Sequence, residues 1–135
     1  MVGLLLLTHG KIGQVMLDEA SDLLSDGLLR ADVLGVEPDA DPDELVRLGG
    51  KLCRQLDEGD GVLVLTDMYG ATPCNVAVRV GKSYGQEKVV IVSGLNMPML
   101  VRLMNYPALN LEQLAEKAKT GACDGIVIYK QQLEV

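Results

Sequence analysis

The sequence contains no phenylalanine, no tryptophan and a single histidine among its 135 residues. A core built from it must rely on aliphatic side chains and methionine, and it offers few of the aromatic platforms on which single-stranded nucleic acids stack. One histidine is also too few for most metal sites. We therefore expect no nucleic-acid partner, no metal and no other cofactor.

Cysteine and long apolar runs are equally scarce. Three cysteines, an odd number without C-x-x-C spacing, are typical of a reduced compartment and predict a cytoplasmic protein. No apolar run approaches the roughly 18 residues that a membrane span requires. No basic segment precedes the first apolar run, so we expect no secretion signal.

Positive charge is in deficit. Twelve basic residues against nineteen acidic ones give a net charge of −7. A phosphate backbone would be repelled by this balance. The acidic surface either serves solubility alone or favours encounter with a basic protein partner.

Continuous apolar segments alternate with helical patterns along the whole chain. Apolar runs without polar alternation are typical of strands buried on both faces of a parallel sheet. We predict a single α/β domain over residues 1–130, with an open, doubly wound, mainly parallel sheet, and a frayed tail over 131–135. The expected strands are Val2–Gly10, Ala31–Val36, Gly61–Thr66, Val89–Ser93 and Ile126–Tyr129.

Several residues predict where the intervening helices begin and end. Asp41 followed by Pro42 is typical of a helix start, and Asn110 with Gln113 resembles a capping box. Glycines near the ends of the apolar periodicity predict helix ends at Gly59, Gly81 and Gly121.

The only histidine, His9, follows the first expected strand, and Asp67 follows the third. Ligands gather beyond the carboxyl ends of parallel strands, above all where the sheet topology switches. If the first and third strands are neighbours, His9 and Asp67 meet, and the carboxylate holds one ring nitrogen and leaves the other nucleophilic. The alternatives are a structural histidine and an aspartate that caps its own turn.

A helix opening at Thr72-Pro73 points to the same edge. Backbone amides of Cys74 and Asn75 would then lie at a positive helix end suited to an anion. The Thr72 hydroxyl could cap the helix or bind an oxyanion. Tyr69 and Asn96 could border the pocket, or could anchor a loop and cap the next helix.

Three segments together resemble the EIIA domain of the mannose/fructose family of the bacterial sugar phosphotransferase system. They are Thr8-His9-Gly10, the stretch Asp67-Met68-Tyr69-Gly70-Ala71-Thr72-Pro73-Cys74-Asn75, and Gly94-Leu95-Asn96-Met97-Pro98-Met99-Leu100, in the order of the family. The resemblance covers residues 1–130.

This resemblance implies a phosphotransferase component in which His9 accepts a phosphoryl group from HPr and passes it to an EIIB partner. Asp67 would bind the other imidazole nitrogen. It also implies a homodimer whose C-terminal strand, near Ile126–Tyr129, pairs antiparallel with the other subunit, and membrane contact only through a transporter complex. The expected phosphoryl-binding residues are Thr72, Thr66, Cys74, Asn75 and Gly10, and the expected pocket rim is Tyr69, Asn96 and Pro98.

Two departures from the family pattern bear on this interpretation. Ala71 stands where the family commonly has a second glycine, and a positive φ there would strain it by roughly 1–2 kcal/mol. No EIIB domain follows, which indicates a free-standing EIIA. The alternatives are a regulatory module controlled by His9 phosphorylation, a phosphodonor subunit of a dihydroxyacetone kinase, and a small hydrolase with His9–Asp67 as general base.

Overall fold

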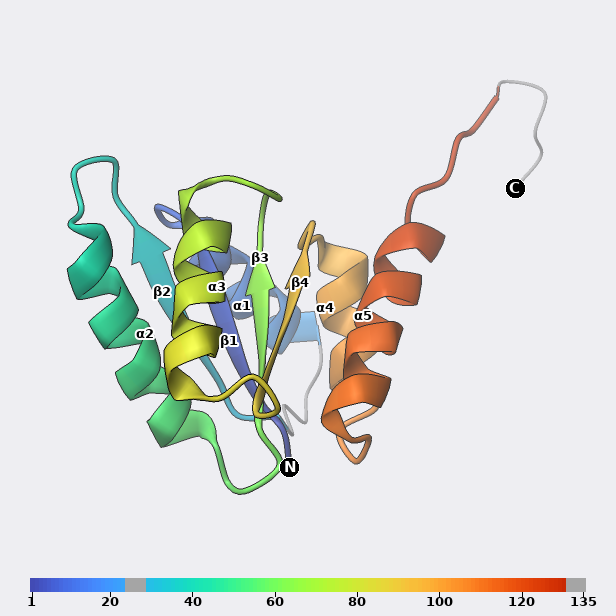
Figure 1. Cartoon of the computed structure of the whole chain (residues 1–135). Coiled ribbons are helices and arrows are strands. Elements are labelled where there is room, and N and C mark those ends of the chain that lie inside the picture. The colour runs from blue at the N-terminus through green and yellow to red at the C-terminus, as the bar shows by residue number, and fades with distance from the viewer. Residues whose placement is uncertain (24–28, 131–135) are drawn as a thin grey trace.

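A four-stranded parallel sheet forms the centre of the computed structural model, which describes residues 1–23 and 29–130 (Figure 1). The strand order β2-β1-β3-β4 places β1 and β3 side by side, as the sequence predicts for a doubly wound sheet. The first four predicted strands agree with the observed ones to within about one residue. Their bounds are β1 Gly3–His9, β2 Ala31–Val36, β3 Val62–Thr66 and β4 Val89–Ser93.

The four leucines of β1, Leu4 to Leu7, are completely buried. Because side chains alternate along a strand, Leu4 and Leu6 join the core on one face of the sheet and Leu5 and Leu7 join the core on the other. Both faces are covered, which explains why the run is apolar without alternation.

Helices α2 and α3 pack on one face of the sheet, and α1, α4 and α5 pack on the other (Figure 1). None of the helices in residues 1–23 and 29–130 is long and apolar enough to cross a membrane. Their bounds are α1 Ile12–Leu23, α2 Pro42–Leu56, α3 Thr72–Tyr84, α4 Met97–Met104 and α5 Leu111–Asp124.

The predicted helix starts are confirmed, whereas the predicted ends are wrong. The Asp41 side chain caps α2, and Asn110 with Gln113 forms the capping box of α5. Helix α2 ends at Leu56, before Gly59, and α3 and α5 continue past their glycines to Tyr84 and Asp124. Gly81 and Gly121 are buried inside these helices.

Gly121 serves helix packing. A Cβ at this position would lie 2.6 Å from the Cβ of Arg102, so the missing side chain allows α5 to approach α4. A glycine in a helical pattern therefore marks a close contact here and not a stop, a distinction that depends on the neighbouring helix.

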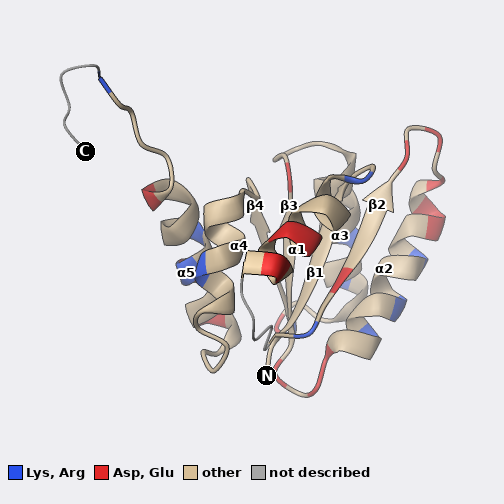
Figure 2. Ribbon diagram, turned by 180° about the vertical axis from the view of Figure 1, so that it is seen from behind, with Lys and Arg blue, Asp and Glu red and all other residues tan. Residues whose placement is uncertain are grey.

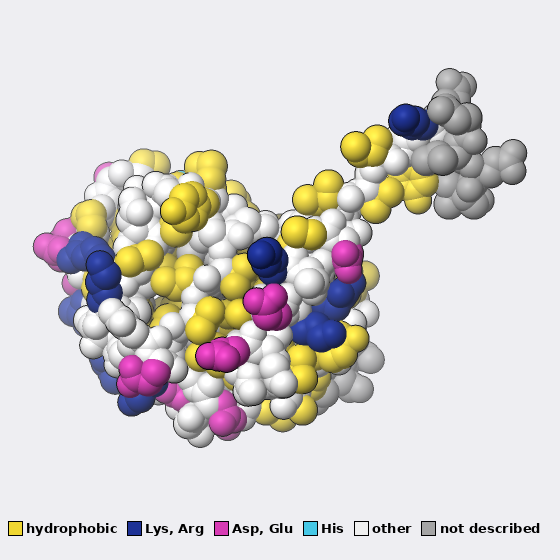
Figure 3. Space-filling view, turned by 45° about the vertical axis from the view of Figure 1, so that its right-hand side comes forward, with side chains coloured by type: hydrophobic (Ala, Val, Ile, Leu, Met, Phe, Trp, Pro, Cys, Tyr) yellow, Lys and Arg dark blue, Asp and Glu magenta, His cyan; other side chains and the backbone are white. Residues whose placement is uncertain are grey.

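The fifth strand predicted at Ile126–Tyr129 is not formed. After α5 the backbone projects away from the domain, and the side chains of 126–129 are 63–81% exposed (Figures 1 and 3). A strand needs a neighbour with which to pair its backbone, and residues 126–129 have no strand neighbour within residues 1–23 and 29–130. Pairing with a second subunit stays a prediction, and the predicted tail over 131–135 lies outside the described residues.

Candidate functional site

Strands β1 and β3 are paired from Gly3–Val62 to Leu6–Leu65, and the helices that follow them lie on opposite faces of the sheet. The chain therefore diverges at this point, and a crevice opens beyond the strand ends. His9 is the last residue of β1, and Asp67 directly follows β3. The predicted convergence of these two residues is confirmed.

One carboxylate oxygen of Asp67 contacts both the ring and the backbone of His9. The ring Nδ1 lies 2.8 Å from Asp67 Oδ2, and the backbone N–H of His9 donates to the same oxygen at 3.2 Å. The His9 side chain is 42% exposed, whereas that of Asp67 is only 12% exposed. The imidazole is thus oriented by a largely buried carboxylate, and its other nitrogen, Nε2, makes no hydrogen bond within the described residues.

The electrostatics of Asp67 favour its ionised form. Burial by itself raises the pKa of Asp67, but the hydrogen bonds from His9, together with the backbone of Asp67 and the charge of His9, hold the pKa below its ordinary value. Its second oxygen, Oδ1, is buried without a partner in the described part of the chain. A carboxylate that stays charged can keep the proton of the ring on Nδ1 and leave Nε2 as the nucleophile.

A cleft of about 580 Å³ opens beside His9. Thr72, the first residue of α3, lines the cleft opposite residues from the loop between β2 and α2. The predicted neighbourhood of His9 and Thr72 is therefore confirmed. The residues that line the cleft are His9, Gly10, Val36, Glu37, Pro38, Ala40, Pro42 and Thr72.

The start of α3 differs in detail from the prediction. Ala71 is the N-cap residue, and no side chain caps the helix, so the predicted capping role of the Thr72 hydroxyl is wrong. The N–H of Asn75 donates to the Ala71 carbonyl at 3.0 Å and is not free for an anion. The N–H groups of Thr72 and Cys74 have no backbone acceptor within the described residues.

The strain considered for Ala71 is absent. Its φ is −81°, an ordinary extended conformation, whereas the neighbouring Gly70 has a φ of +80°. The loop between β3 and α3 therefore needs only one glycine, and the alanine fits without cost.

Two expected phosphoryl ligands have other roles. Gly10 has a φ of +46°, which explains the glycine, but its N–H donates to the Val36 carbonyl at 2.9 Å. Thr66 is completely buried, and its hydroxyl bonds to Ser93 Oγ at 3.0 Å. Both groups are engaged inside the fold, so we revise their expected role to support of the site.

None of the three expected rim residues, Tyr69, Asn96 and Pro98, lines the cleft. Tyr69 is 86% exposed in the loop between β3 and α3. Asn96 instead caps α4 through the Met99 N–H and donates to the Ala122 carbonyl at 3.2 Å. Pro98 lies against Gly125, at the end of α5. Asn96 and Pro98 thus join α4 to α5 in this chain, and neither lines the cleft.

One wall of the cleft was not anticipated from the sequence. The loop between β2 and α2 supplies Glu37, and acidic residues are concentrated in this loop and at the start of α2 (Figure 2). Asp43 pairs with Arg79 at 2.7 Å, but Glu37 and Asp39 form no ion pair within residues 1–23 and 29–130. This wall therefore presents uncompensated negative charge next to His9.

Gly35 and Thr8 were also missed. A Cβ on Gly35 would collide with the Gly10 carbonyl oxygen, so this glycine makes room for the turn after His9. Thr8 is buried directly before His9. The short stretch of sequence around each residue does not predict these features, because they depend on contacts with other segments of the chain.

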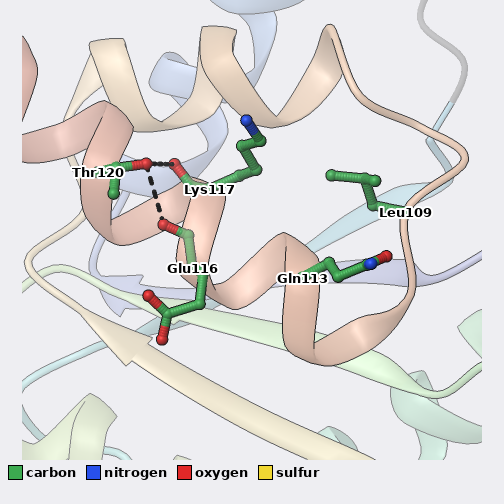
Figure 4. Close-up of a pocket in the computed structure, with 5 residues that line it drawn as sticks. All are labelled: Leu109, Gln113, Glu116, Lys117 and Thr120. Atoms are coloured by element: carbon green, nitrogen blue, oxygen red, sulfur yellow. Dashed lines mark hydrogen bonds between the residues drawn. The ribbon is translucent and has the colours of Figure 1, made fainter.

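A second hollow, of about 350 Å³, lies along α5 and the loop before it (Figure 4). Leu109, Gln113 and Thr120 contribute to its lining, and none of the predicted site residues does. The Lys117 ammonium, which also lines it, lies 4.3 Å from the centre of the Tyr106 ring. The residues that could take part in a reaction therefore lie at the His9 cleft and not at this hollow.

Comparison with a family model and with known proteins finds matches to components of the phosphotransferase system. Residues 3–119 match the EIIA-man family model, described as "PTS system fructose IIA component". Over 105 residues the chain is 28% identical to the "PTS system mannose-specific EIIAB component" of Escherichia coli (strain K12). That alignment covers 76% of this chain but only 31% of the relative, so the chain spans about a third of the curated relatives that it matches.

Solved structures share the fold. The mannose/sorbose-specific IIA subunit of Enterococcus faecalis superposes with a TM-score of 0.85 at 20% identity, covering 99% of this chain and 98% of that chain. A PTS IIA protein associated with the fucose utilization operon of Streptococcus pneumoniae superposes with a TM-score of 0.71 at 29% identity. That match covers 89% of this chain and 93% of the other.

Proposed function

Since the chain belongs to the EIIA family of mannose/fructose phosphotransferase components, we propose that it is a phosphohistidine carrier. His9 accepts a phosphoryl group from phospho-HPr and passes it to an EIIB protein or domain. The observation that carries this proposal is the 2.8 Å contact between His9 Nδ1 and Asp67 Oδ2, which leaves Nε2 as the free nucleophile of a half-exposed ring.

In the transfer step, the lone pair of His9 Nε2 forms a bond to phosphorus while the N–P bond of the donor histidine breaks. The electron pair of the broken bond returns to the donor imidazole. His9 gains positive charge as Nε2 becomes bonded to phosphorus, and the ionised Asp67 stabilises this charge through Nδ1–H. In the second transfer, from His9 to EIIB, the N–P bond at Nε2 breaks and its electron pair returns to the His9 imidazole.

The start of α3 supports the phosphoryl oxygens in this proposal. The Thr72 hydroxyl lies on the cleft, and the N–H groups of Thr72 and Cys74 are the amides without a backbone acceptor at that helix end. Phosphoryl transfer demands mainly positioning and stabilisation of negative charge, which such a helix start supplies. No metal or cofactor is part of this mechanism.

We place the protein in the cytoplasm as a homodimer, with membrane contact only through a transporter complex. The segment 126–129 has four exposed apolar side chains, and β4 forms an edge of the sheet within the chain. An extended apolar segment and an open sheet edge are complementary, which supports exchange of this segment between two subunits.

The test is incubation with phosphoenolpyruvate, enzyme I and HPr, followed by intact mass measurement of wild type and His9→Ala. We expect one acid-labile phosphoryl group on the wild type and none on the variant. Addition of a cognate EIIB should then remove the label from the wild type. A wild-type protein that stays unlabelled with an active donor would refute the proposal.

A further inference from the structure

Thr8 is one of only two polar residues that are fully buried in the described part of the chain, the other being Thr66. It follows four buried leucines in β1, and a valine would fill nearly the same space without a hydroxyl. Burying a hydroxyl costs free energy unless it is hydrogen-bonded. The hydrogen bonds of the Thr8 hydroxyl therefore indicate its structural role.

The Thr8 hydroxyl connects two parts of the chain. Its oxygen accepts the backbone N–H of Gly13, at 2.9 Å, and it donates to the His9 carbonyl at 3.3 Å. Gly13 is the second residue of α1, whose first amides have no acceptor inside the helix. The Thr8 hydroxyl, five positions earlier on the strand, thus accepts one of the N–H groups at the start of α1 that lack an acceptor within the helix.

The approach requires Gly13 itself. A Cβ on Gly13 would lie 2.8 Å from the Thr8 hydroxyl oxygen and 3.1 Å from its methyl carbon. The first turn of α1 therefore sits directly against Thr8. His9, at the end of β1, and the turn Gly10–Lys11 lie between these two contact points. The N–H groups of His9 and Gly10 bond to Asp67 and Val36.

We propose that Thr8 is a positioning residue for the phosphoacceptor. Its hydroxyl, held between the Gly13 N–H and the His9 carbonyl, fixes the backbone of His9 so that ring Nδ1 meets Asp67 and Nε2 faces the cleft. Thr8 does not touch the phosphoryl group in this arrangement. The effect on transfer rests on the proposed function, whereas the effect on the ring can be measured without it.

The experiment compares Thr8→Val, which keeps the volume, with Thr8→Ser, which keeps the hydroxyl. We expect the valine variant to accept phosphate from HPr about 10–100-fold more slowly, because small displacements of a reacting group have effects of this size. The serine variant should recover most of the rate. In ¹⁵N NMR of the imidazole, Thr8→Val should lose the predominance of the Nδ1–H tautomer that wild type and Thr8→Ser retain.

Leu114→Ala provides a control for lost stability. Leu114 is fully buried on α5, so its truncation destabilises the fold by leaving a cavity without changing the Thr8 bonds. We expect this variant to keep the wild-type tautomer and rate. A Thr8→Val protein that also keeps both would overturn the proposal.

A second measurement applies even where Thr8→Val does not fold. Amide hydrogen exchange in the wild type should find the Gly13 N–H strongly protected, and an exchange rate like that of a free amide would overturn the proposal. If no donor labels the wild type, the proposed function fails, but the tautomer measurement still decides the role of Thr8.

Discussion

Asp67 Oδ2 binds His9 through both its backbone N–H, at 3.2 Å, and its ring Nδ1, at 2.8 Å. A single carboxylate oxygen therefore sets the position of the main chain and the orientation of the imidazole. Because the two residues are 58 positions apart, the strand ends bring the nucleophile and its orienting group together only in the folded sheet.

Replacing Asp67 by asparagine should slow phosphoryl uptake by about 100-fold or more, because an amide can donate to Nδ1 and favour the tautomer that has its proton on Nε2. The initial rate of labelling by phospho-HPr measures the effect. Asp22→Asn makes the same chemical change near the end of α1 and should label like the wild type. An Asp67→Asn protein that labels at the wild-type rate would show that the carboxylate does not orient the ring.

Neutralising two acidic residues of the loop between β2 and α2, Glu37 in the cleft wall and Asp39 beside it, should have opposite effects on transfer from two donors. The variant carries Glu37→Gln and Asp39→Asn. Transfer from a protein donor that presents basic residues should slow by roughly threefold to tenfold and depend less on salt, because complementary charge speeds encounter. Labelling by phosphoramidate, a small anion, should become faster because the wall repels it less.

The matched control for this charge change is Glu112→Gln with Glu116→Gln on α5, away from the cleft. It removes the same amount of charge from the chain and should leave both rates near those of the wild type. Equal changes in the two double variants would assign the effect to net charge and not to the wall.

Tyr84 should ionise late and weaken the fold when it does. Burial, together with its hydrogen bond to Asp57 at 2.9 Å, raises the pKa of Tyr84 to about 12. An unfolded tyrosine ionises near pH 10, so the stabilisation is complete below about pH 10 and is lost as pH rises toward 12. Phenolate absorbance should include one step near pH 12 that is absent in Tyr84→Phe.

The same variant has an expected cost at neutral pH. Removing the hydroxyl leaves Asp57 without one of its donors and should lower the free energy of unfolding by about 1 kcal/mol in urea titrations. A Tyr84→Phe protein with unchanged stability at pH 7 would mean that water replaces the phenol at Asp57.

In the native protein, a disulfide reagent should react with the exposed thiol of Cys123 but not with the buried thiols of Cys53 and Cys74. Burial raises the pKa of Cys53 to about 11, and its side chain has no exposed surface, so it should react only after unfolding. Cys123 is exposed on α5 and should react within the native state. Cys123→Ser should therefore abolish the rapid phase, and persistence of that phase would contradict this assignment.

The parallel sheet was predictable because its strands are buried on both faces, and an uninterrupted apolar run such as Leu4–Leu7 has few other interpretations. Helix starts were predictable for a similar reason. Asp41 and Asn110 bond to amides two or three residues ahead, so the signal is contained in a short stretch of sequence. Helix ends were not predictable in this way. Gly121 does not end α5 but makes room for Arg102 on the neighbouring helix, and this contact has no signal in the local sequence.

Local chemistry in the sequence determined which residues carry potential for reaction: one histidine after a buried strand, an aspartate after another, and a Thr-Pro helix start. Tertiary structure alone decided which of their neighbours are available to a ligand. The Gly10 amide, the Asn75 amide and the Thr66 hydroxyl are all engaged by partners within the fold. A hydrogen bond satisfied inside the protein removes a group from the site, and its partner is known only when distant segments meet.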